Sequence, residues 1–582
     1  VSPWLTFKLF RKYAEEHAGK AAFEGHAETP EEDRLHRFYQ KLFTPLLESA
    51  GKRWALIGGV VVLLLLSTSL VFFKVAKVKM LPYDNKSEIQ VVVDMPEGTT
   101  LEATNAVARD LARKVRNEPE VTDVQVYVGT TAPFNFNGLV RHYFLRSGPL
   151  VADLQVNLLP KQERKRDSHT FAKDVRTLLL PIAKRHGANI KVTEVPPGPP
   201  VLSTMVAEIY GPDMAKRIDL ARQVRTIFEE TPGIVDVDWH VEDEAPKVEL
   251  VVDREKATRA GVTPEVVTRT LRVALNGADA GLLRDESSRN PVPIVLRLDR
   301  SQRSSLDGLL QTAVHGGTGR LVPLRELVTV KETKSERFIY HKNLQPVTYV
   351  LAEMAGVAEA PVYGILDMGE RIEALKAPDG SPLQVMSTTL PTDSTKYAMK
   401  WDGEWHITYE VFRDMGIAFA AVLVLIYFLV VGWFRSFVTP LIIMAPIPLT
   451  LIGILPAHGL FGIFFTATSM IGFIALAGII VRNSILLVDF INLELEMGEK
   501  LEDAVIKAGA VRFRPIALTA AALVVGGGVI LLDPIFQGLA VALIAGVVVA
   551  TALTLVVIPL LYYMYLKAVG IEKALPPRDE AA

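Results

Sequence analysis

The sequence predicts a membrane α-helical bundle of six transmembrane helices, joined to an α+β region built from ferredoxin-like βαβ repeats. Two observations predict this fold class. Six apolar runs have roughly the 20-residue length that crosses a hydrocarbon core as a helix, and strand–helix–strand patterns recur in the long polar stretch after the first run. The composition fits a chain that meets two environments, because 49% of its 582 residues are hydrophobic and 22% are charged.

One apolar run stands alone, and the other five follow the polar stretch almost without interruption. We expect the six spans at Ala55–Phe73, Met415–Trp433, Ser436–Pro456, Gly459–Val488, Pro515–Leu532 and Leu539–Leu566. Basic residues gather on one set of connections, namely Lys41, Lys52, Arg53, Arg435, Lys500, Lys507, Arg512, Arg514 and Lys567. The opposite loops, Ala457–Gly459 and Asp533–Phe536, contain no Lys or Arg. Because basic residues in short loops favour the cytoplasm, we expect both ends inside the cell and residues 79–410 outside it.

An amphipathic pattern precedes the first span. Its apolar positions recur at helical spacing, at Leu35, Phe38, Tyr39, Leu42, Phe43, Leu46 and Leu47. Charged residues occupy the other face, so we expect a helix lying on the inner membrane surface. A packed helix of a soluble domain is the alternative.

Four strand–helix–strand units are expected in the polar stretch. They are Ile89–Val93 to Val128, Leu154–Leu158 to Val195, Val206–Tyr210 to Trp239, and Val347–Leu351 to Met386. Two of their helix-to-strand turns are alike, Pro119-Glu-Val-Thr-Asp-Val and Pro232-Gly-Ile-Val-Asp-Val. Repeated units of this kind form small α+β sandwiches. Residues 246–336 interrupt the last such unit with strands and helices of their own, which predicts an inserted subdomain.

Several classes of function are excluded or disfavoured by composition and motif. The formal charge of −2 gives no electrostatic basis for a nucleic-acid partner. The chain has no Cys, which excludes disulfides and thiol chemistry. It contains no Walker A, H-E-x-x-H or G-x-S-x-G pattern, and its His residues lack metal-ligand spacing. We therefore expect that the protein is not an enzyme and that it has no cofactor and no metal centre.

The membrane region carries one informative charge, Arg482 within the fourth span. An ionised side chain at membrane depth normally implies a partner or a water-filled path. Asp489 lies two helical turns further along the same face, about 10 Å away, which is too far for direct contact. We infer that the carboxylate partner of Arg482 lies outside this sequence. A snorkelling or structural Arg is the alternative.

Arg512 and Thr519 repeat the same seven-residue spacing at the start of the fifth span. From the residues alone, Arg512 is as well explained as an ordinary cytoplasmic charge. Thr519 is as well explained by a hydroxyl that bonds back to its own helix. Both interpretations stay open at this point.

The chain resembles the second half of a resistance-nodulation-division (RND) permease. The resemblance covers essentially the whole chain: one span, a large βαβ-repeat region and five further spans. Its most specific motifs are Gly478-Ile-Ile-Val-Arg-Asn-Ser-Ile-Leu-Leu-Val-Asp489 and Arg512-Phe-Arg-Pro-Ile-Ala-Leu-Thr519. The opening Val1-Ser-Pro-Trp-Leu looks like the end of a preceding span. Met80-Leu-Pro-Tyr-Asp-Asn-Lys-Ser-Glu and Phe134-Asn-Phe-Asn-Gly-Leu resemble the hydrophobe/amphiphile branch that includes triclosan-type pumps.

The resemblance implies a division of the chain and a set of site residues. In the membrane part, it assigns residues 1–53 to the end of a preceding span and the surface helix, 54–78 to the first span, 411–567 to five spans and 568–582 to a cytoplasmic tail. In the external part, it assigns 79–203 to one porter subdomain, 204–245 with 337–410 to the other, and 246–336 to a docking funnel. It places a proton relay at Arg482, Asn483, Arg512 and Thr519, and a substrate-contacting aromatic loop at Phe134 and Phe136. The family's best-known members have Lys where Arg482 stands, and Arg stays charged at essentially any pH. Arg482 is therefore expected to act as a fixed counter-charge.

The function implied is proton-driven export of hydrophobic or amphiphilic small molecules from the periplasm or inner membrane of a bacterium. The expected partners are a periplasmic adaptor, an outer-membrane channel and a missing first half that carries the proton-binding acids, in a homotrimer. Heavy-metal export by the same superfamily is the nearest alternative, although the 13 Met residues are scattered. A non-transporting scaffold with an external binding module is the alternative from another class.

Overall fold

The computed structural model describes residues 30–133, 135–356 and 359–571, so the expectations for residues 1–29 and for Phe134 lie outside the described residues. The chain divides into two compact units. The larger holds the membrane helices and two βαβ subdomains, and the smaller comprises Val241–Tyr340 with Met95–Thr100. Each is described by itself.

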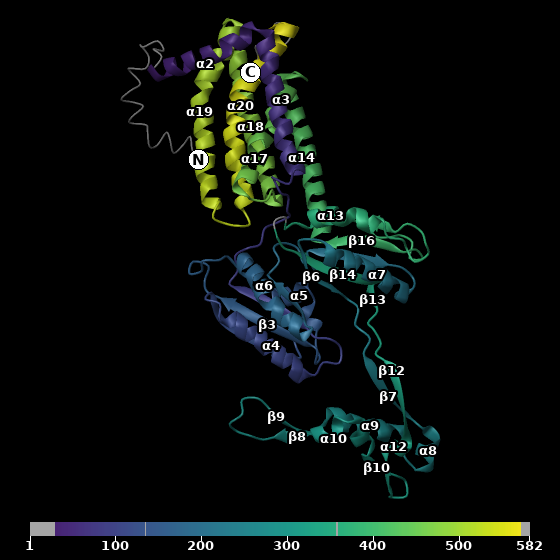
Figure 1. The fold of residues 1–582 in the computed structure, drawn as a ribbon. Coiled ribbons are helices and arrows are strands. Elements are labelled where there is room, and N and C mark those ends of the chain that lie inside the picture. Colours follow the sequence, from purple (N-terminus) through teal and green to yellow (C-terminus); the bar gives the residue numbers. More distant parts are fainter. Residues whose placement is uncertain (1–29, 134, 357–358, 572–582) are drawn as a thin grey trace. The chain divides into compact units, whose positions relative to one another are not determined.

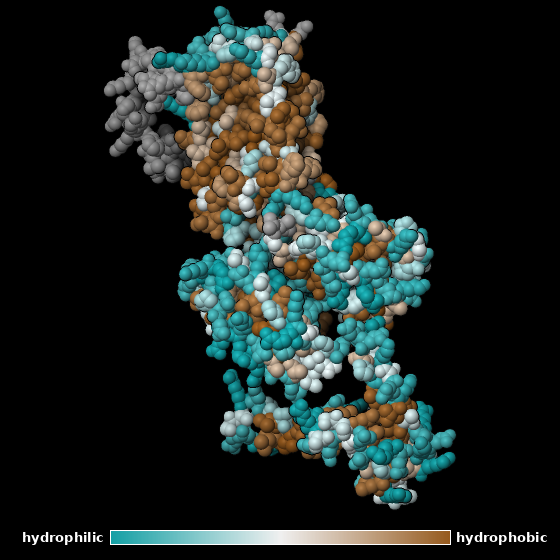
Figure 2. All heavy atoms as spheres, viewed as in Figure 1, coloured by the Kyte–Doolittle hydropathy of each residue, from teal (hydrophilic) through white to brown (hydrophobic). Residues whose placement is uncertain are grey.

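Six helices of the larger unit are long and apolar enough to cross a membrane (Figure 1). They are α3 (Ala50–Phe72), α14 (Glu404–Phe434), the consecutive segments α15 (Thr439–Met444), α16 (Pro446–Leu449) and α17 (Leu451–Phe461), then α18 (Ala467–Glu496), α19 (Leu501–Ile530) and α20 (Gln537–Val569). The apolar windows of α17, α18 and α20 are about half buried, whereas those of α3 and α14 are 6% buried. Helices α17, α18 and α20 therefore form the centre of the bundle, and the face of the bundle seen in Figure 2 is largely apolar.

The expected loop at Ala457–Gly459 is wrong. These residues lie inside α17, whose last turn ends at Gly462 in the left-handed conformation, and α18 begins only after its N-cap Thr466. The prediction used Pro456 as a helix end, yet Pro is tolerated in membrane helices where neighbours satisfy the freed carbonyl. The basic stretch expected to connect the fourth and fifth spans is also helical, because α19 already begins at Leu501.

The amphipathic helix α2 (Pro30–Glu48) packs against the bundle. Tyr39 and Phe43 are buried, and the ring of Tyr39 meets Phe513 of α19 at 6.4 Å. Gly509 of α19 makes room for that ring, since a Cβ there would lie 2.5 Å from it. The apolar face predicted from the spacing is thus directed at α19.

The first βαβ subdomain, here called the β1–β4 subdomain, has the ferredoxin-like topology that the repeats predict. It comprises β1 (Glu88–Asp94), α4 (Leu101–Arg116), β2 (Val121–Val128), α5 (Phe136–Val140), a 3-10 turn (Tyr143–Leu145), β3 (Val151–Leu158), α6 (Ser168–His186) and β4 (Asn189–Thr193). The sheet order is β2-β3-β1-β4 with every pair antiparallel. Both long helices cover one face of this sheet.

The second βαβ subdomain, here called the β5–β16 subdomain, contains two strands more than predicted, β13 and β16. It comprises β5 (Met205–Tyr210), α7 (Met214–Glu230), β6 (Ile234–Trp239), β13 (Tyr340–Lys342), β14 (Gln345–Met354), α13 (Pro361–Glu373), β15 (Gln384–Met386) and β16 (Ala398–Gly403). The unpredicted strand β16 lies between β5 and β15 and leads into α14.

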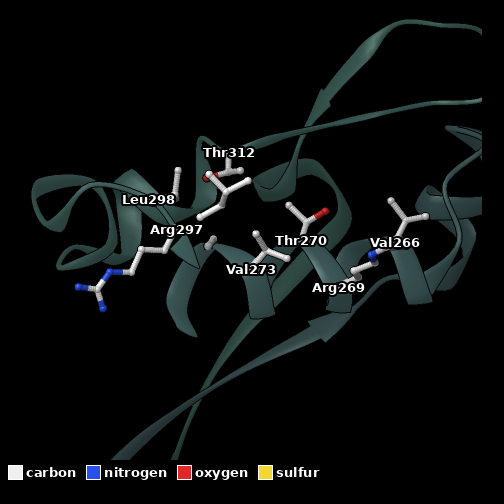
Figure 3. A pocket seen from close by; sticks show the side chains of 9 residues that line it. Val266, Arg269, Thr270, Val273, Arg297, Leu298 and Thr312 are labelled. Carbon is white, nitrogen blue, oxygen red and sulfur yellow. The ribbon is translucent and has the colours of Figure 1, made fainter. Parts of the chain in front are cut away.

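The smaller unit is built around a ribbon of β7 (Pro246–Val252) and β12 (Val328–Lys334). Between them lie α8 (Arg254–Arg259), α9 (Pro264–Asn276), the hairpin β8 (Ala278–Leu283) and β9 (Val292–Leu296), α10 (Arg300–Arg303), α11 (Leu306–Leu310), β10 (Ala313–His315), β11 (Leu321–Pro323) and α12 (Leu324–Leu327). Helix α9 and the end of β9 border a cavity of about 540 Å³ (Figure 3). Its wall is mostly aliphatic, with Arg269 and Arg297 among the lining residues.

Candidate functional site

The predicted relay residues lie on two neighbouring helices, α18 and α19. Arg482 is exposed on the surface of α18, while the next residue, Asn483, is buried. Among the described residues, Arg482 forms no ion pair or hydrogen bond. Its charge therefore sits on an outer face of the six-helix bundle.

Arg512 and Thr519 lie two turns apart on α19. The guanidinium of Arg512 lies 4.9 Å from the centre of the Phe490 ring on α18, within the range of a cation–π contact. The hydroxyl of Thr519 donates to the carbonyl of Pro515 at 2.9 Å, which is the back-bonding geometry that the sequence left open. The structure thus brings Arg512 against α18 and keeps Thr519 bonded to its own helix.

The aromatic segment is a single helical turn in the β1–β4 subdomain. Asn135 caps α5 by accepting a hydrogen bond from the amide of Gly138 at 2.7 Å. This cap directs Phe136 outward, with 46% of its surface exposed. Asn137 is buried and donates to the Thr193 hydroxyl of β4 at 3.3 Å. Phe136 is therefore an exposed aromatic side chain on a well-anchored turn.

Sequence reasoning missed a cluster of charges where the two βαβ subdomains meet. On α6, His169, Lys173 and Arg176 follow at i, i+4 and i+7, which places them on one helix face. His169 and Lys173 each lie 2.7 Å from a carboxylate oxygen of Glu359 in the β5–β16 subdomain. The helical spacing of these three basic residues was the signal that could have predicted the interface.

Arg176 and Lys191 continue the same interface. The guanidinium of Arg176 binds both oxygens of Asp236 at 2.9 Å. Lys191 of β4 pairs with Asp238, two residues along β6 from Asp236. The backbone of Asp236 lies in the left-handed region, with a φ of 52°, beside a register shift between β14 and β6. Asp tolerates this conformation better than most residues, and the shift directs its carboxylate to Arg176 and to the Val192 amide at 3.2 Å.

The most deeply buried pair of the interface joins Arg141, the residue that follows α5, to Glu353 of β14. Their side chains are 3% and 9% exposed. Ser203 also donates to the Glu353 carboxylate, at 2.9 Å. Burial raises the pKa of Glu353, but the Arg141 charge and these hydrogen bonds outweigh it and hold the pKa below its ordinary value. Glu353 is therefore ionised.

His169 is an interface group whose ordinary pKa of 6.5 lies near neutral pH. Burial lowers its pKa, but hydrogen bonds to Glu194 and Glu359 outweigh burial and raise the pKa to about 9. The Tyr83 ring stacks on the imidazole at 4.7 Å. A cavity of about 210 Å³ lies beside it, and the buried Lys79 lines that cavity. No group of three or more His, Cys, Asp or Glu side chains suited to a metal ion occurs in the part of the chain that the structure describes.

The fold and these sites define a multi-pass membrane protein whose external part contains two ferredoxin-like subdomains. The model of the AcrB/AcrD/AcrF family matches residues 11–566. The chain belongs to this family of RND transporters.

Curated relatives are distant, and the chain spans about half the length of those it matches. The cation efflux system protein CzcA of Alcaligenes sp. (strain CT14) is 24% identical over 94% of this chain and 50% of its own length. The nickel and cobalt resistance protein CnrA of Cupriavidus metallidurans is 27% identical over 81% of this chain and 42% of its own. The multidrug resistance protein MdtC of Escherichia coli O139:H28 is 21% identical over 93% and 50%.

A crystal structure of a heavy metal efflux pump has the same fold, with a TM-score of 0.74 and 22% identity over 92% of this chain and 52% of the pump. The RND resemblance is thus confirmed at the level of family. The expected hydrophobe/amphiphile branch is not distinguished, because the metal-resistance relatives match at higher identity than MdtC.

Proposed function

We propose that this chain forms the second half of a proton-driven RND permease of the bacterial inner membrane. The architecture carries this proposal: one span, two ferredoxin-like subdomains with an insertion, and five spans, in a chain that the family model matches over residues 11–566. Because a transporter built from two repeated halves needs both, the first half completes it. The complete protein exports its cargo as a homotrimer, with a periplasmic adaptor and an outer-membrane channel.

Arg482 is the central residue of the proposed proton relay. It lies in an apolar span and faces out of the six-helix bundle, where further helices can pack. An acid of the first half meets it there, because an ionised Arg at membrane depth requires compensation. Since Arg does not release its proton near neutral pH, Arg482 holds the charge balance while that acid gains and loses a proton. Asn483, Arg512 and Thr519 complete this half of the relay.

We propose metal cations as the first candidate cargo. The support is the set of relatives, since CzcA and CnrA are named for cation efflux and for nickel and cobalt resistance and match at 24% and 27% identity. Hydrophobic or amphiphilic compounds are the second candidate. Exposed Phe136 favours them, because an aromatic side chain on an anchored turn supplies apolar contact area.

One experiment tests both the relay and the cargo. The complete transporter that contains this chain is produced in cells lacking their own exporters, with Arg482→Ala and, as a matched control, Lys500→Ala. Lys500 is an exposed basic residue at the start of α19. Cells are then challenged with Zn²⁺, Co²⁺, Ni²⁺ and Cd²⁺ and, separately, with hydrophobic biocides, while the protein level in the membrane is measured.

The parent and Lys500→Ala should protect cells against the metals, and Arg482→Ala should not, at equal protein levels. Protection against biocides alone would show that hydrophobic or amphiphilic compounds, and not metal cations, are the cargo. Full protection by Arg482→Ala would refute the relay.

A further inference from the structure

The interface between the β1–β4 and β5–β16 subdomains is segregated by charge. In each ion pair that joins them among the described residues, the cation belongs to the β1–β4 subdomain and the anion to the β5–β16 subdomain. The pairs are Arg141–Glu353, His169–Glu359, Lys173–Glu359, Arg176–Asp236 and Lys191–Asp238. The cations of these pairs thus lie on one side of the interface and the anions on the other, and the two sets attract each other.

Among the described residues, each subdomain has buried apolar residues of its own. The main buried apolar cluster of the β5–β16 subdomain consists of residues between Met205 and Trp401, with Trp405 beside it. The β1–β4 subdomain buries its own strands and helices, for example Val91, Leu154 and Phe171. Since each subdomain has its own sheet and core, the interface can separate without unfolding either one.

A buried ion pair such as Arg141–Glu353 contributes little to stability compared with apolar side chains of the same size. Its best-attested use is to fix a register or a switch. Charged walls also become hydrated when they part, whereas apolar walls resist separation. An interface of this composition is therefore suited to repeated opening and closing.

Arg141 connects this interface to the aromatic turn. It directly follows α5, and its amide donates to the carbonyl of Asn137 at 2.9 Å, inside the turn. Its guanidinium pairs with Glu353 in the other subdomain. Helix α5 is thus held from two sides, by Asn137 on Thr193 of its own sheet and by Arg141 on β14.

We propose that the five ion pairs form a releasable clasp and that Arg141–Glu353 is a positioning pair, which sets the place of α5 and Phe136 according to whether the two subdomains are closed. If the chain is part of an exporter as proposed above, this coupling makes contact between Phe136 and cargo depend on closure. The clasp itself rests on the contacts alone. The cations and anions of the five pairs attract across an open cleft, so the clasp recloses in register.

The absence of Cys makes the proposal measurable by spin labels introduced in pairs. One pair, Arg109→Cys on α4 with Gln223→Cys on α7, reports the separation of the subdomains, and both positions are exposed. A second pair, Leu139→Cys on α5 with Arg109→Cys on α4, reports the place of α5 within its own subdomain. Distances are measured by pulsed electron resonance in the purified full chain, which requires no transport.

Glu353→Gln removes the acid charge at nearly constant shape. We expect the ratio of long to short distances to rise about tenfold or more for the first label pair, because a buried Arg is left uncompensated. The distance of the second pair should shift at the same time. Ser203→Ala should shift both in the same direction by less, and it remains usable if Glu353→Gln folds poorly. Unchanged distances in a folded variant would overturn the clasp, and movement of the first pair alone would overturn the coupling to α5.

Asp219→Asn is the matched control. It removes one carboxylate from an exposed pair with Arg222 on α7, away from the interface. Both distance distributions should stay as in the parent, and an equal shift would overturn the proposal. If Glu353→Gln moves both distances while the complete transporter exports nothing, the clasp stands and the proposed function fails.

Discussion

The protonation of His169 gives a quantitative test of the ionic interface, because its ordinary pKa of 6.5 lies close to neutrality and its pKa in the closed interface is about 9. The side chain of His169 is 21% exposed, so solvent screening leaves most of this difference in place. The groups that face it or its stacked ring are Glu194, Glu359, Lys173, Asp167, Tyr83 and Lys79. Acids predominate around the ring, in agreement with the raised pKa.

The sign of the pH dependence follows from the raised pKa. A group whose pKa is higher in the closed state stabilises that state fully below pH 6.5, and the contribution is lost as pH rises through 9. The difference between the two pKa values corresponds to about 3 kcal/mol. If the imidazole regains its ordinary pKa when the subdomains separate, raising the pH from 6 to 10 favours the open state by up to this amount.

The assay is the distance between labels at Arg109→Cys and Gln223→Cys, measured across this pH range. The parent should open progressively above pH 6.5. His169→Gln should be more open at pH 6 and lose most of the pH dependence. His186→Gln, at the end of the same helix and 3.7 Å from Asp110, is the control and should behave as the parent. The reasoning would be refuted if His169→Gln kept the full pH dependence.

Two further predictions concern stability, measured as the melting temperature of the purified chain. Gly538→Ala places a Cβ 2.3 Å from the Ser469 hydroxyl in the N-terminal cap of α18, so it should lower the free energy of unfolding by about 1–3 kcal/mol. The control is Gly526→Ala, whose Cβ meets open space, and it should leave the melting temperature unchanged. Lys400→Met leaves the buried Glu208 without one of its cations and should lower the free energy of unfolding by about 3–5 kcal/mol. Lys400→Arg keeps the charge and should lower it clearly less. Equal losses of stability in the two variants would contradict the electrostatic explanation.

The sequence was sufficient for the elements in which one physical signal dominates. Apolar length predicted all six spans, and alternation with helical periodicity predicted the long helices and most strands of both βαβ subdomains. It failed at Pro456, where a local rule for helix ends was overridden by packing: α17 continues through it to the buried His458, which hydrogen-bonds Ser469 of α18 at 3.0 Å. Only the neighbouring helix reveals that partner.

Strand β16 was missed for a related reason. Its sequence Ala-Met-Lys-Trp-Asp-Gly places a Lys at the centre of a buried strand, which contradicts the apolar pattern expected there. Lys400 is 1% exposed because it lies 3.3 Å from both Glu208 and Asp402, and Glu208 comes from a strand almost 200 residues earlier. A buried charge can be predicted only together with its partner, and sequence spacing does not identify partners this far apart.

The same limit explains the two different outcomes for basic residues in this chain. Arg141 is separated from Glu353 by 212 positions, so its role became visible only when folding joined the two subdomains. Arg482 was identified from sequence because an apolar span makes a charge conspicuous, yet within the described residues its partner is not present. Folding of this chain thus compensates the charges of the clasp internally and leaves Arg482 on an outer face. A side chain left in that position is explained if a further part of the transporter supplies the acid, and this is the physical reason for placing the relay at a junction between two halves.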